Sequence, residues 1–298
     1  MDTIDKVRAF YIISTFTLLL INALPSLRGC LIDYGARAKA ADSKKGNNKS
    51  KDKEISTSWT VPHSYFTHFY IFSILASTFW AVQILQRGPA FRALAEGLSE
   101  KHRLQSMSVN QVILCWSLMA IQGSRRLYEC IAIAKSSKSR MGFLHWLLAI
   151  AYYAATNVAV WIEGSGALLS TDIKLEHFRI TTPPSLRTML FVPIFLIASG
   201  IQHDSHQYLA SLKTYTIPSH PLFQRIICPH YTAECVIYIS LAFLAAPQGE
   251  MLNKTMLSCL FFVVSNLGVT AGGTANWYRE KFGEEGVRGR WRMIPWIY

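Results

Sequence analysis

Seven long apolar blocks divide this chain of 298 residues, and they limit what it can fold into more than any other feature. The blocks cover residues 7–24, 65–85, 109–134, 143–162, 188–201, 231–246 and 255–271. Long apolar runs are typical of membrane-spanning helices, because about 20 residues at 1.5 Å each cross the hydrocarbon layer. Charged residues make up 16% of the chain, against about 25% in a soluble domain. The sequence therefore predicts an all-α integral membrane protein with about seven transmembrane helices.

The basic residues predict which side of the membrane each terminus faces. An odd number of spans places the two termini on opposite sides. With the C-terminus in the cytosol, most of the 30 lysine and arginine residues fall in cytosolic segments, as the positive-inside rule requires. Loops that face anionic lipid explain the net charge of +12, and no nucleic-acid-binding motif is present. We therefore expect membrane lipid, and no nucleic acid, as a partner.

Polarity divides the chain into three regions. Residues 1–63 hold the first predicted span and a basic cytosolic loop, whose lysine-rich segment 37–54 has the composition of a disordered linker. Residues 64–187 hold the second to fourth spans. Residues 188–298 form a C-terminal region in which polar residues concentrate. The six cysteines include no CxxC pair, so they indicate neither a disulfide framework nor a zinc site.

Two polar pairs stand at the ends of apolar blocks. His230 and Glu234 lie four residues apart at the start of the sixth block, so on a helix they share one face. Gln202 and His206 follow the fifth block with the same spacing. A charged acid at the centre of a bilayer costs about 2.5–3.5 kcal/mol on insertion scales. We therefore expect Glu234 to face a cavity between helices and to have partners there.

A nucleotide site explains these polar residues better than a metal site. The nine histidines are too scattered to supply the ligands of a two-iron centre, so we expect no metal. No P-loop is present, and no complete GxGxxG follows a strand. Arginines, amides, histidines and aromatic rings from separate helices can nevertheless hold a dinucleotide. For any one of these residues, a hydrogen bond between helices is the alternative interpretation.

Four motifs in the last third of the chain resemble one known family. They are G-x-x-x-x-x-H-x-x-L-x-x-L-K from Gly200, Y-x-I-P from Tyr215, P-H-Y-x-A-E from Pro229, and W-Y-x-x-K-F from Trp277 with a closing R-x-x-x-I-P-W-I-Y. In identity and spacing they resemble the C-terminal domain of the steroid 5α-reductase family, and more closely its polyprenol reductase branch. The resemblance covers residues 125–298. The resemblance therefore implies that residues 188–298 form the reductase region, which carries the cofactor-binding motifs.

The resemblance implies a seven-helix enzyme of the endoplasmic reticulum membrane, with a cytosolic C-terminus and NADPH bound from the cytosolic side. Carried over position by position, the expected cofactor-binding residues are Arg126, Gln202, His206, Lys213, Tyr215, His230, Glu234, Tyr278 and Arg290.

Two departures from the family pattern leave the catalytic acid open. The steroid branch has a tyrosine where this chain has Gly123, and the animal polyprenol branch has a histidine where this chain has Ala275. His68 is our candidate, because it is polar within an otherwise apolar second span, with a structural hydrogen bond as the alternative. Glu234 is the second catalytic candidate.

The expected reaction is reduction of the α-isoprene double bond of polyprenol or polyprenal to give dolichol or dolichal, for dolichol-linked protein N-glycosylation. An allylic alcohol offers hydride no electrophilic carbon, whereas the β carbon of an enal does. We therefore expect the aldehyde as substrate, with the alcohol still open. The alternatives are a steroid or enoyl reductase, a methyltransferase of the isoprenylcysteine type, and a lipid transporter without catalysis. The sequence does not specify the chain length, the oligomeric state or the path of the isoprenoid.

Overall fold

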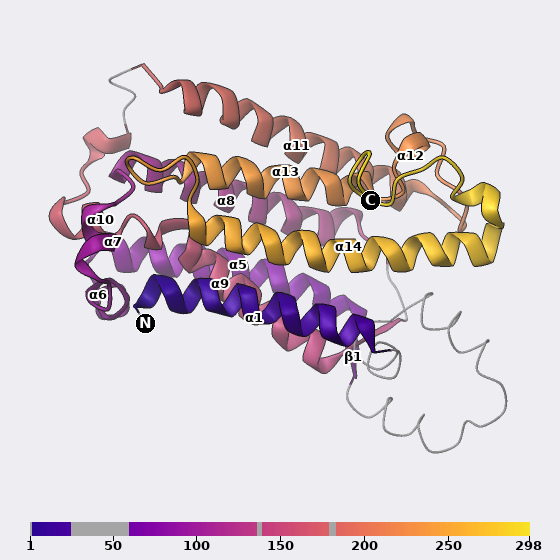
Figure 1. Cartoon of the computed structure of the whole chain (residues 1–298), viewed down its shortest axis with the longest axis horizontal. Helices are drawn as coiled ribbons and strands as arrows, with labels where there is room; N and C mark the ends of the chain where they lie inside the picture. Colours follow the sequence, from indigo (N-terminus) through magenta and orange to yellow (C-terminus); the bar gives the residue numbers. More distant parts are fainter. Residues whose placement is uncertain (1, 25–59, 136–138, 179–182) are drawn as a thin grey trace.

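A computed structural model describes residues 2–24, 60–135, 139–178 and 183–298. Over these residues the protein is mostly helical, and its long helices lie side by side in one bundle (Figure 1). These helices are α1 (Thr3–Ala23), α5 (Phe66–Leu85), α8 (Val109–Tyr128), α9 (Phe143–Ile162), α11 (Leu186–Ser211), α13 (Pro229–Leu244) and α14 (Lys254–Phe282). Each coincides with one predicted apolar block. The predicted linker at residues 37–54 lies outside the described residues.

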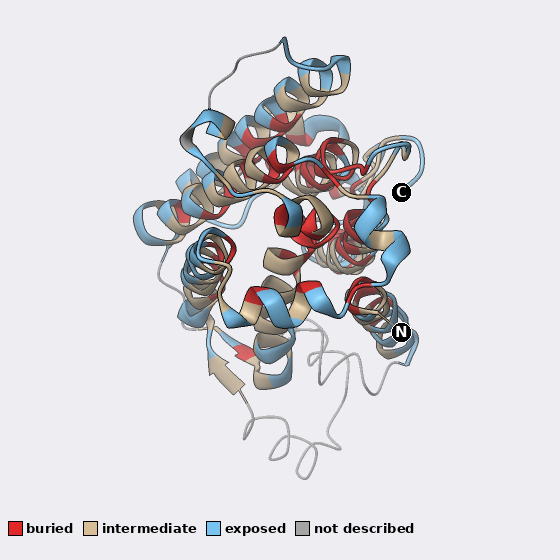
Figure 2. Ribbon diagram, turned by 90° about the vertical axis from the view of Figure 1, so that its left-hand side faces the viewer, coloured by how far each residue is buried: buried red, intermediate tan, exposed pale blue. Residues whose placement is uncertain are grey.

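Several of these helices have the length and composition of membrane spans. In the described part of the chain, four qualify: His63–Leu85, Phe143–Ile162, Leu186–Ser211 and Lys254–Phe282. Large apolar side chains also cover the outside of the bundle: Phe16, Leu75 and Ile197 are each more than 60% exposed. Buried residues face the interior in the view along the bundle (Figure 2). An apolar surface of this kind is stable in lipid rather than in water, so the chain is a multi-pass membrane protein. That α1, α8 and α13 also cross the membrane stays a prediction.

Two helices are longer than their apolar blocks. Helix α11 continues ten residues past position 201, and α14 continues eleven residues past position 271. The apolar block marks only the part of a helix that lipid can surround. The helix itself continues wherever polar side chains find partners inside the protein, as Gln202 and His206 do on α11.

Helix α8 does not end in a loop but passes into a π-helical turn, Glu129–Ile133. Its start is fixed by a capping box, in which Ser108 and Gln111 satisfy each other's backbone N–H groups. π-Helical turns are rare and occur frequently at functional sites. Here the turn follows Arg125 and Arg126 and begins with Glu129, whose side chain is buried.

Short elements close the two ends of the bundle. At one end lie α6 (Pro89–Glu96), α7 (Glu100–Leu104) and α10 (Ser165–Ser170), and at the other α12 (Pro221–Arg225). Single helical turns cover His63–Tyr65, Leu175–Phe178 and Glu284–Gly286.

A two-stranded antiparallel sheet, absent from the sequence prediction, joins β1 (Thr60–Pro62) to β2 (Arg140–Gly142) in the register Thr60↔Gly142. Because β1 lies just before α5 and β2 directly before α9, the sheet holds the starts of these two helices together.

A buried ion pair fixes the opposite end of the bundle. The guanidinium of Arg8 on α1 donates to the carboxylate of Glu163, just after α9, at 2.8 Å. The backbone N–H of Thr255 on α14 donates to the same carboxylate oxygen, also at 2.8 Å. One acid therefore connects α1, α9 and α14.

Candidate functional site

A cavity of ≈ 220 Å³ lies inside the bundle, towards the end where the β1–β2 sheet is found, and all seven long helices contribute to its wall. Successive helices reach it at opposite ends of their sequence. Arg126 comes near the end of α8, His145 near the start of α9, Gln202 from the second half of α11, and Glu234 from the first half of α13. Helices that alternate in direction present such positions at one depth of the bundle.

The wall of the cavity has a polar part and an aromatic part. Arg126, Gln202, His206 and Glu234 form the polar part. Aromatic rings from α5, α9 and α14 form much of the rest, and the rings of Phe69 and Tyr153 stack with centroids 6.1 Å apart. A polar group attached to an apolar chain matches such a cavity.

Glu129 anchors the charged groups beside the cavity. Its side chain is 4% exposed, and its carboxylate accepts hydrogen bonds from Arg125 and Arg126, one helical turn before it. On α11, the Nδ1 atoms of His203 and His206 lie 2.7 Å and 2.8 Å from the same carboxylate. Removing one partner of a buried ion pair typically costs about 3–5 kcal/mol. Glu129 therefore couples the end of α8 to the second half of α11.

The hydrogen on His206 can follow one of two routes. Its Nδ1 lies 2.8 Å from a Glu129 oxygen and 2.6 Å from Nη1 of Arg126. Arginine only donates and carboxylate only accepts. The Nδ1 atom therefore donates to Glu129 when it bears the hydrogen, and accepts from Arg126 when it does not.

A relay of amides links this charged cluster to Glu234. The Nε2 of Gln122 on α8 donates to the Oε1 of Gln202 on α11 at 2.8 Å. Gln202 in turn donates from its own Nε2 to the carboxylate of Glu234. Arg125 also donates to Gln202, so the amide oxygen is fixed and its N–H group is directed at the acid. Glu234 thus has the partner and the cavity that the sequence predicts for it.

Arg126 also binds a phenol. Its Nε and Nη2 donate to the hydroxyl oxygen of Tyr70 on α5 at 3.1 Å and 2.8 Å. The guanidinium carbon lies 4.9 Å from the centroid of the same ring. The fork of Arg126 is therefore held rigidly between α5 and the Glu129 cluster.

His230 lies beside the polar wall, although it is outside the cavity lining. Its ring centroid is 5.3 Å from that of His206. Its Nδ1 is buried and has no hydrogen-bond partner among the described residues. A buried polar atom without a partner is expensive in free energy, so the atom is suited to a ligand.

Tyr278 and Arg290 belong to a second cluster, where the C-terminal tail packs against the start of α13. The backbone N–H groups of Ile227 and Cys228 donate to carbonyls of the tail at 2.8 Å and 3.1 Å. Tyr278 is buried there against Ile227 and Cys228. The Nη1 of Arg290 is buried without a hydrogen-bond partner in the described part of the chain. The tail thus brings Arg290 towards the helix end from which His230 projects.

Lys213 and Tyr215 lie apart from this arrangement. Both are exposed, in the segment after α11. The ring centroids of Tyr215 and Trp277 lie 5.3 Å apart, and the ammonium of Lys281 lies 4.5 Å from the centroid of the Tyr215 ring. Neither Lys213 nor Tyr215 lines the cavity, and their cofactor roles stay predictions.

His68 does not line the cavity either. Its ring packs on Tyr65 and Trp146, with centroids 4.3 Å and 6.3 Å away. The structure therefore gives a packing environment to the residue that we considered for the catalytic acid, and its catalytic role has no geometric support.

Several residues of the site were missed in the sequence. Glu129, Arg125, Gln122 and His203 form the cluster, and Tyr70 lines the cavity. A signal for Glu129 was present, because an acid within an apolar block, one turn after two arginines, suggests an internal ion pair. Gln122 and Tyr70 carry no such signal.

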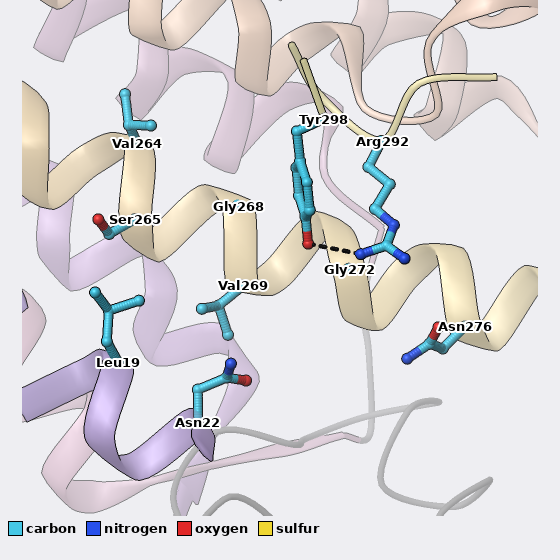
Figure 3. Close-up of a pocket in the computed structure, with 10 residues that line it drawn as sticks. All are labelled: Leu19, Asn22, Val264, Ser265, Gly268, Val269, Gly272, Asn276, Arg292 and Tyr298. Carbon is cyan, nitrogen blue, oxygen red and sulfur yellow. Dashed lines mark hydrogen bonds between the residues drawn. The ribbon is translucent and has the colours of Figure 1, made fainter.

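A second cavity, of ≈ 370 Å³, lies on the other face of α14, against α1 (Figure 3). The ring of the terminal residue, Tyr298, stands beside Gly268 and Gly272, and its hydroxyl accepts a hydrogen bond from Arg292 at 2.9 Å. A Cβ on Gly272 would lie 2.7 Å from that hydroxyl oxygen. The closing motif of the sequence therefore folds back onto α14.

The polar wall fits a pyridine dinucleotide in its chemistry. Guanidinium groups suit phosphates, amide and carboxylate groups suit sugar hydroxyls and a carboxamide, and the unpaired atoms of His230 and Arg290 are open to new partners. The ≈ 220 Å³ cavity is smaller than a typical small-molecule site of about 300–1,000 Å³. It accommodates the reacting end of a ligand rather than a whole dinucleotide. Among the described residues, no group of three or more His, Cys, Asp or Glu side chains is arranged to hold a metal ion.

Comparison with known proteins points to one family. The family model described as 3-oxo-5-alpha-steroid 4-dehydrogenase matches residues 150–298. Polyprenal reductase 2 of Oryza sativa subsp. japonica is 28% identical over 91% of this chain and 89% of its own length. The polyprenal reductase of Saccharomyces cerevisiae is 28% identical over 91% of this chain and 88% of its own length. Polyprenal reductase of Caenorhabditis elegans is 25% identical over 90% of this chain.

The helical bundle, its polar cavity and these matches define a membrane-embedded oxidoreductase. The chain belongs to the steroid 5α-reductase family, in its polyprenol reductase branch.

Proposed function

We propose that this protein is an NADPH-dependent polyprenal reductase, which saturates the α-isoprene double bond and so leads to dolichol for protein N-glycosylation. The observation that carries the proposal is the single cavity in which Arg126, Gln202, His206 and Glu234 face aromatic side chains. The names of the rice and yeast relatives support the same substrate class.

The polar side chains hold the cofactor in this proposal. Arg290, whose Nη1 has no partner among the described residues, binds a phosphate group, since guanidinium pairs with phosphate in two-point geometry. Arg126, whose nitrogens are held by Tyr70, Glu129 and His206, contributes its positive charge beside the cofactor. The carboxylate of Glu234 already accepts a hydrogen bond from the amide of Gln202. In the proposed complex it also accepts one from the carboxamide or from a ribose hydroxyl of the cofactor. His206 and His230 complete the set beside them. When bound, NADPH supplies a hydride.

The chemistry favours the aldehyde over the alcohol. In an α,β-unsaturated aldehyde, the β carbon accepts hydride because negative charge moves onto the carbonyl oxygen. One preorganised hydrogen-bond donor to that oxygen is worth about 3–4 kcal/mol of the barrier. An allylic alcohol has no such route, so the alcohol requires prior oxidation.

The proposed setting is the endoplasmic reticulum membrane, with all seven long helices as spans and the C-terminus in the cytosol. The three regions keep their proposed roles. Residues 1–63 anchor the chain, residues 64–187 face the isoprenoid, and residues 188–298 bind the cofactor. The exposed apolar outer surface of the bundle supports the membrane setting.

A direct assay tests this function. The purified protein in detergent is given NADPH or NADH with polyprenal or polyprenol, and the products are analysed by mass spectrometry. We expect a mass gain of two hydrogens with polyprenal and NADPH. Turnover of polyprenol alone would contradict the aldehyde, and no turnover of either would contradict the reductase.

Ligand-induced stabilisation separates the alternatives. A ligand that binds only the folded state raises the Tm, by an amount that grows with its concentration over Kd. We expect NADPH to raise the Tm and S-adenosylmethionine to leave it unchanged. The reverse result would indicate the methyltransferase, and no response to either nucleotide would favour the transporter.

A further inference from the structure

The hydroxyl of Tyr70 stands in the cavity wall and is held by a guanidinium. Tyr70 is 6% exposed, and its oxygen accepts from both Nε and Nη2 of Arg126. A phenol has two acceptor lone pairs and one O–H donor. Because Arg126 uses the lone pairs, the hydrogen of Tyr70 is directed away from Arg126. The phenol of Tyr153, also in the cavity wall, shares a side-chain hydrogen bond with this hydroxyl.

Gly123 explains why Tyr70 reaches Arg126. A Cβ on Gly123 would lie 3.5 Å from Oγ of Ser73 and 3.8 Å from Ile74 on α5, so α5 packs directly on this glycine. Tyr70 lies one turn before Ser73 on α5, and Arg126 one turn after Gly123 on α8. Close packing at the glycine therefore places the phenol beside the guanidinium.

Other groups in or near the cavity are less suited to donate a proton. The hydroxyl of Tyr152 already donates to Tyr238 at 2.6 Å. Glu234 is an acceptor for Gln202. Tyr153 lines the cavity, but no guanidinium contacts its oxygen in the described structure. Tyr70 combines a hydroxyl in the cavity wall with a cation, Arg126, that stabilises the phenolate left after the hydrogen has gone.

We propose that Tyr70 is the catalytic acid that donates its proton to the carbonyl oxygen of the substrate, with Arg126 as the residue that positions it and stabilises its phenolate. This assignment rests on the proposed reduction of an enal. It also gives a catalytic role to α5, a helix that lies outside the motifs of the C-terminal region.

The proton and electron balance is as follows. As the β carbon receives hydride, the C=C electrons move to the bond between the α carbon and the carbonyl carbon. The C=O pair then moves to oxygen, which takes the proton of Tyr70 and gives an enol. The α carbon next takes a proton from water, and the enol O–H proton returns to the Tyr70 phenolate. The net change is one hydride and one proton added, and Tyr70 is regenerated.

The first measurement compares kcat and KM of the wild type with those of Tyr70→Phe. Loss of one preorganised donor typically lowers kcat about 10²–10³-fold, and we expect this with KM for polyprenal changed less than threefold. Tyr153→Phe, which removes a neighbouring phenol oxygen without an arginine partner, should lower kcat less than tenfold. Tyr128→Phe, on an exposed ring that does not line the cavity, should leave kcat unchanged.

The second measurement does not depend on turnover. A polyisoprenoid carboxamide keeps the carbonyl acceptor but is not reduced, and its Kd is measured from tryptophan fluorescence in detergent. We expect Tyr70→Phe to weaken it about tenfold and Tyr153→Phe to weaken it less than threefold. The rise of Tm with NADPH should persist in Tyr70→Phe, which shows that the variant is folded. If Tyr70→Phe does not fold, Tyr70→His, which keeps a ring N–H donor, should bind the carboxamide within threefold of the wild type, and a larger loss would overturn the assignment.

Two outcomes are informative in different ways. Unchanged kcat and unchanged carboxamide affinity in Tyr70→Phe would overturn the assignment. If the wild type reduces no polyprenal, the proposed function fails, and the carboxamide affinity still decides whether Tyr70 binds a carbonyl oxygen.

Discussion

Glu129 and His206 are separated by 77 positions in the chain, yet the Nδ1 of His206 lies 2.8 Å from the carboxylate of Glu129. This contact joins the π-helical turn after α8 to α11. Four basic groups converge on one buried acid, so the geometry of the cavity wall depends on Glu129 although Glu129 does not line the cavity.

Glu129→Gln should lower both stability and cofactor binding. The substitution removes the charge that pairs with Arg125 and Arg126, and leaving a buried cation unpaired costs about 3–5 kcal/mol. We expect a clear drop in Tm in detergent and a much smaller rise of Tm with NADPH. Glu250→Gln, which removes an acid from a surface pair with Lys254, is the control and should change neither value. Equal Tm values for Glu129→Gln and the wild type would contradict this role.

Glu234→Gln should leave the fold intact and weaken NADPH. The amide can still accept from Gln202, but it loses the charge that favours hydrogen bonds from the cofactor. We expect the Kd for NADPH to rise about tenfold, which equals about 1.4 kcal/mol. Titration of the purified variant by fluorescence measures this. If the affinity and the activity stayed at wild-type values, Glu234 would be a structural residue.

The size of the side chain at position 123 should control activity. A Cβ at Gly123 meets its neighbours at ordinary van der Waals distances of 3.5 Å and 3.8 Å, so Gly123→Ala should fold and keep its activity. Alanine also stabilises the helix by about 0.5–1 kcal/mol relative to glycine. Gly123→Leu should push α5 away from α8 and separate Tyr70 from Arg126, so kcat should fall steeply while the protein stays folded. Steady-state kinetics and Tm of the two variants check this, and equal kcat values would contradict it.

Acid should weaken the attachment of the N-terminus. Burial raises the pKa of Asp2, but hydrogen bonds from the Asp5 and Ser99 backbone and from His102 outweigh it and hold the pKa below its usual 3.8. Because the folded pKa is lower than the unfolded one, the stabilisation is complete above the unfolded value and is lost as pH falls towards the folded value.

The Tm difference between the wild type and Asp2→Asn, measured from pH 7 to pH 3, tests this. It should be constant above about pH 5 and shrink below it. A difference that grows on acidification would show the opposite sign and refute the linkage.

The sequence by itself determined the class of protein and much of the polar wall of the cavity. Apolar blocks located the seven long helices of the described residues, because lipid requires a continuous run of apolar side chains and internal hydrogen bonds. The same reasoning identified Glu234 as an acid with a partner, since an unpaired charge inside a membrane is too costly to retain. Arg126, Gln202, His206 and Glu234 lie together as the spacing of the motifs suggests.

The tertiary structure alone decided how helices from the two halves of the chain meet. Tyr70 on α5 contacts Arg126 because α5 packs closely on Gly123. The distance between the two helices cannot be inferred from the sequence of either one. The contact between Gln122 and Gln202 also could not be inferred from the sequence. His68 is a further case, because its polarity suggested a place in the site, whereas its ring packs on Tyr65 and Trp146. Periodicity gives the face of a helix, whereas the neighbour of that face is set by side-chain volumes summed over the whole bundle.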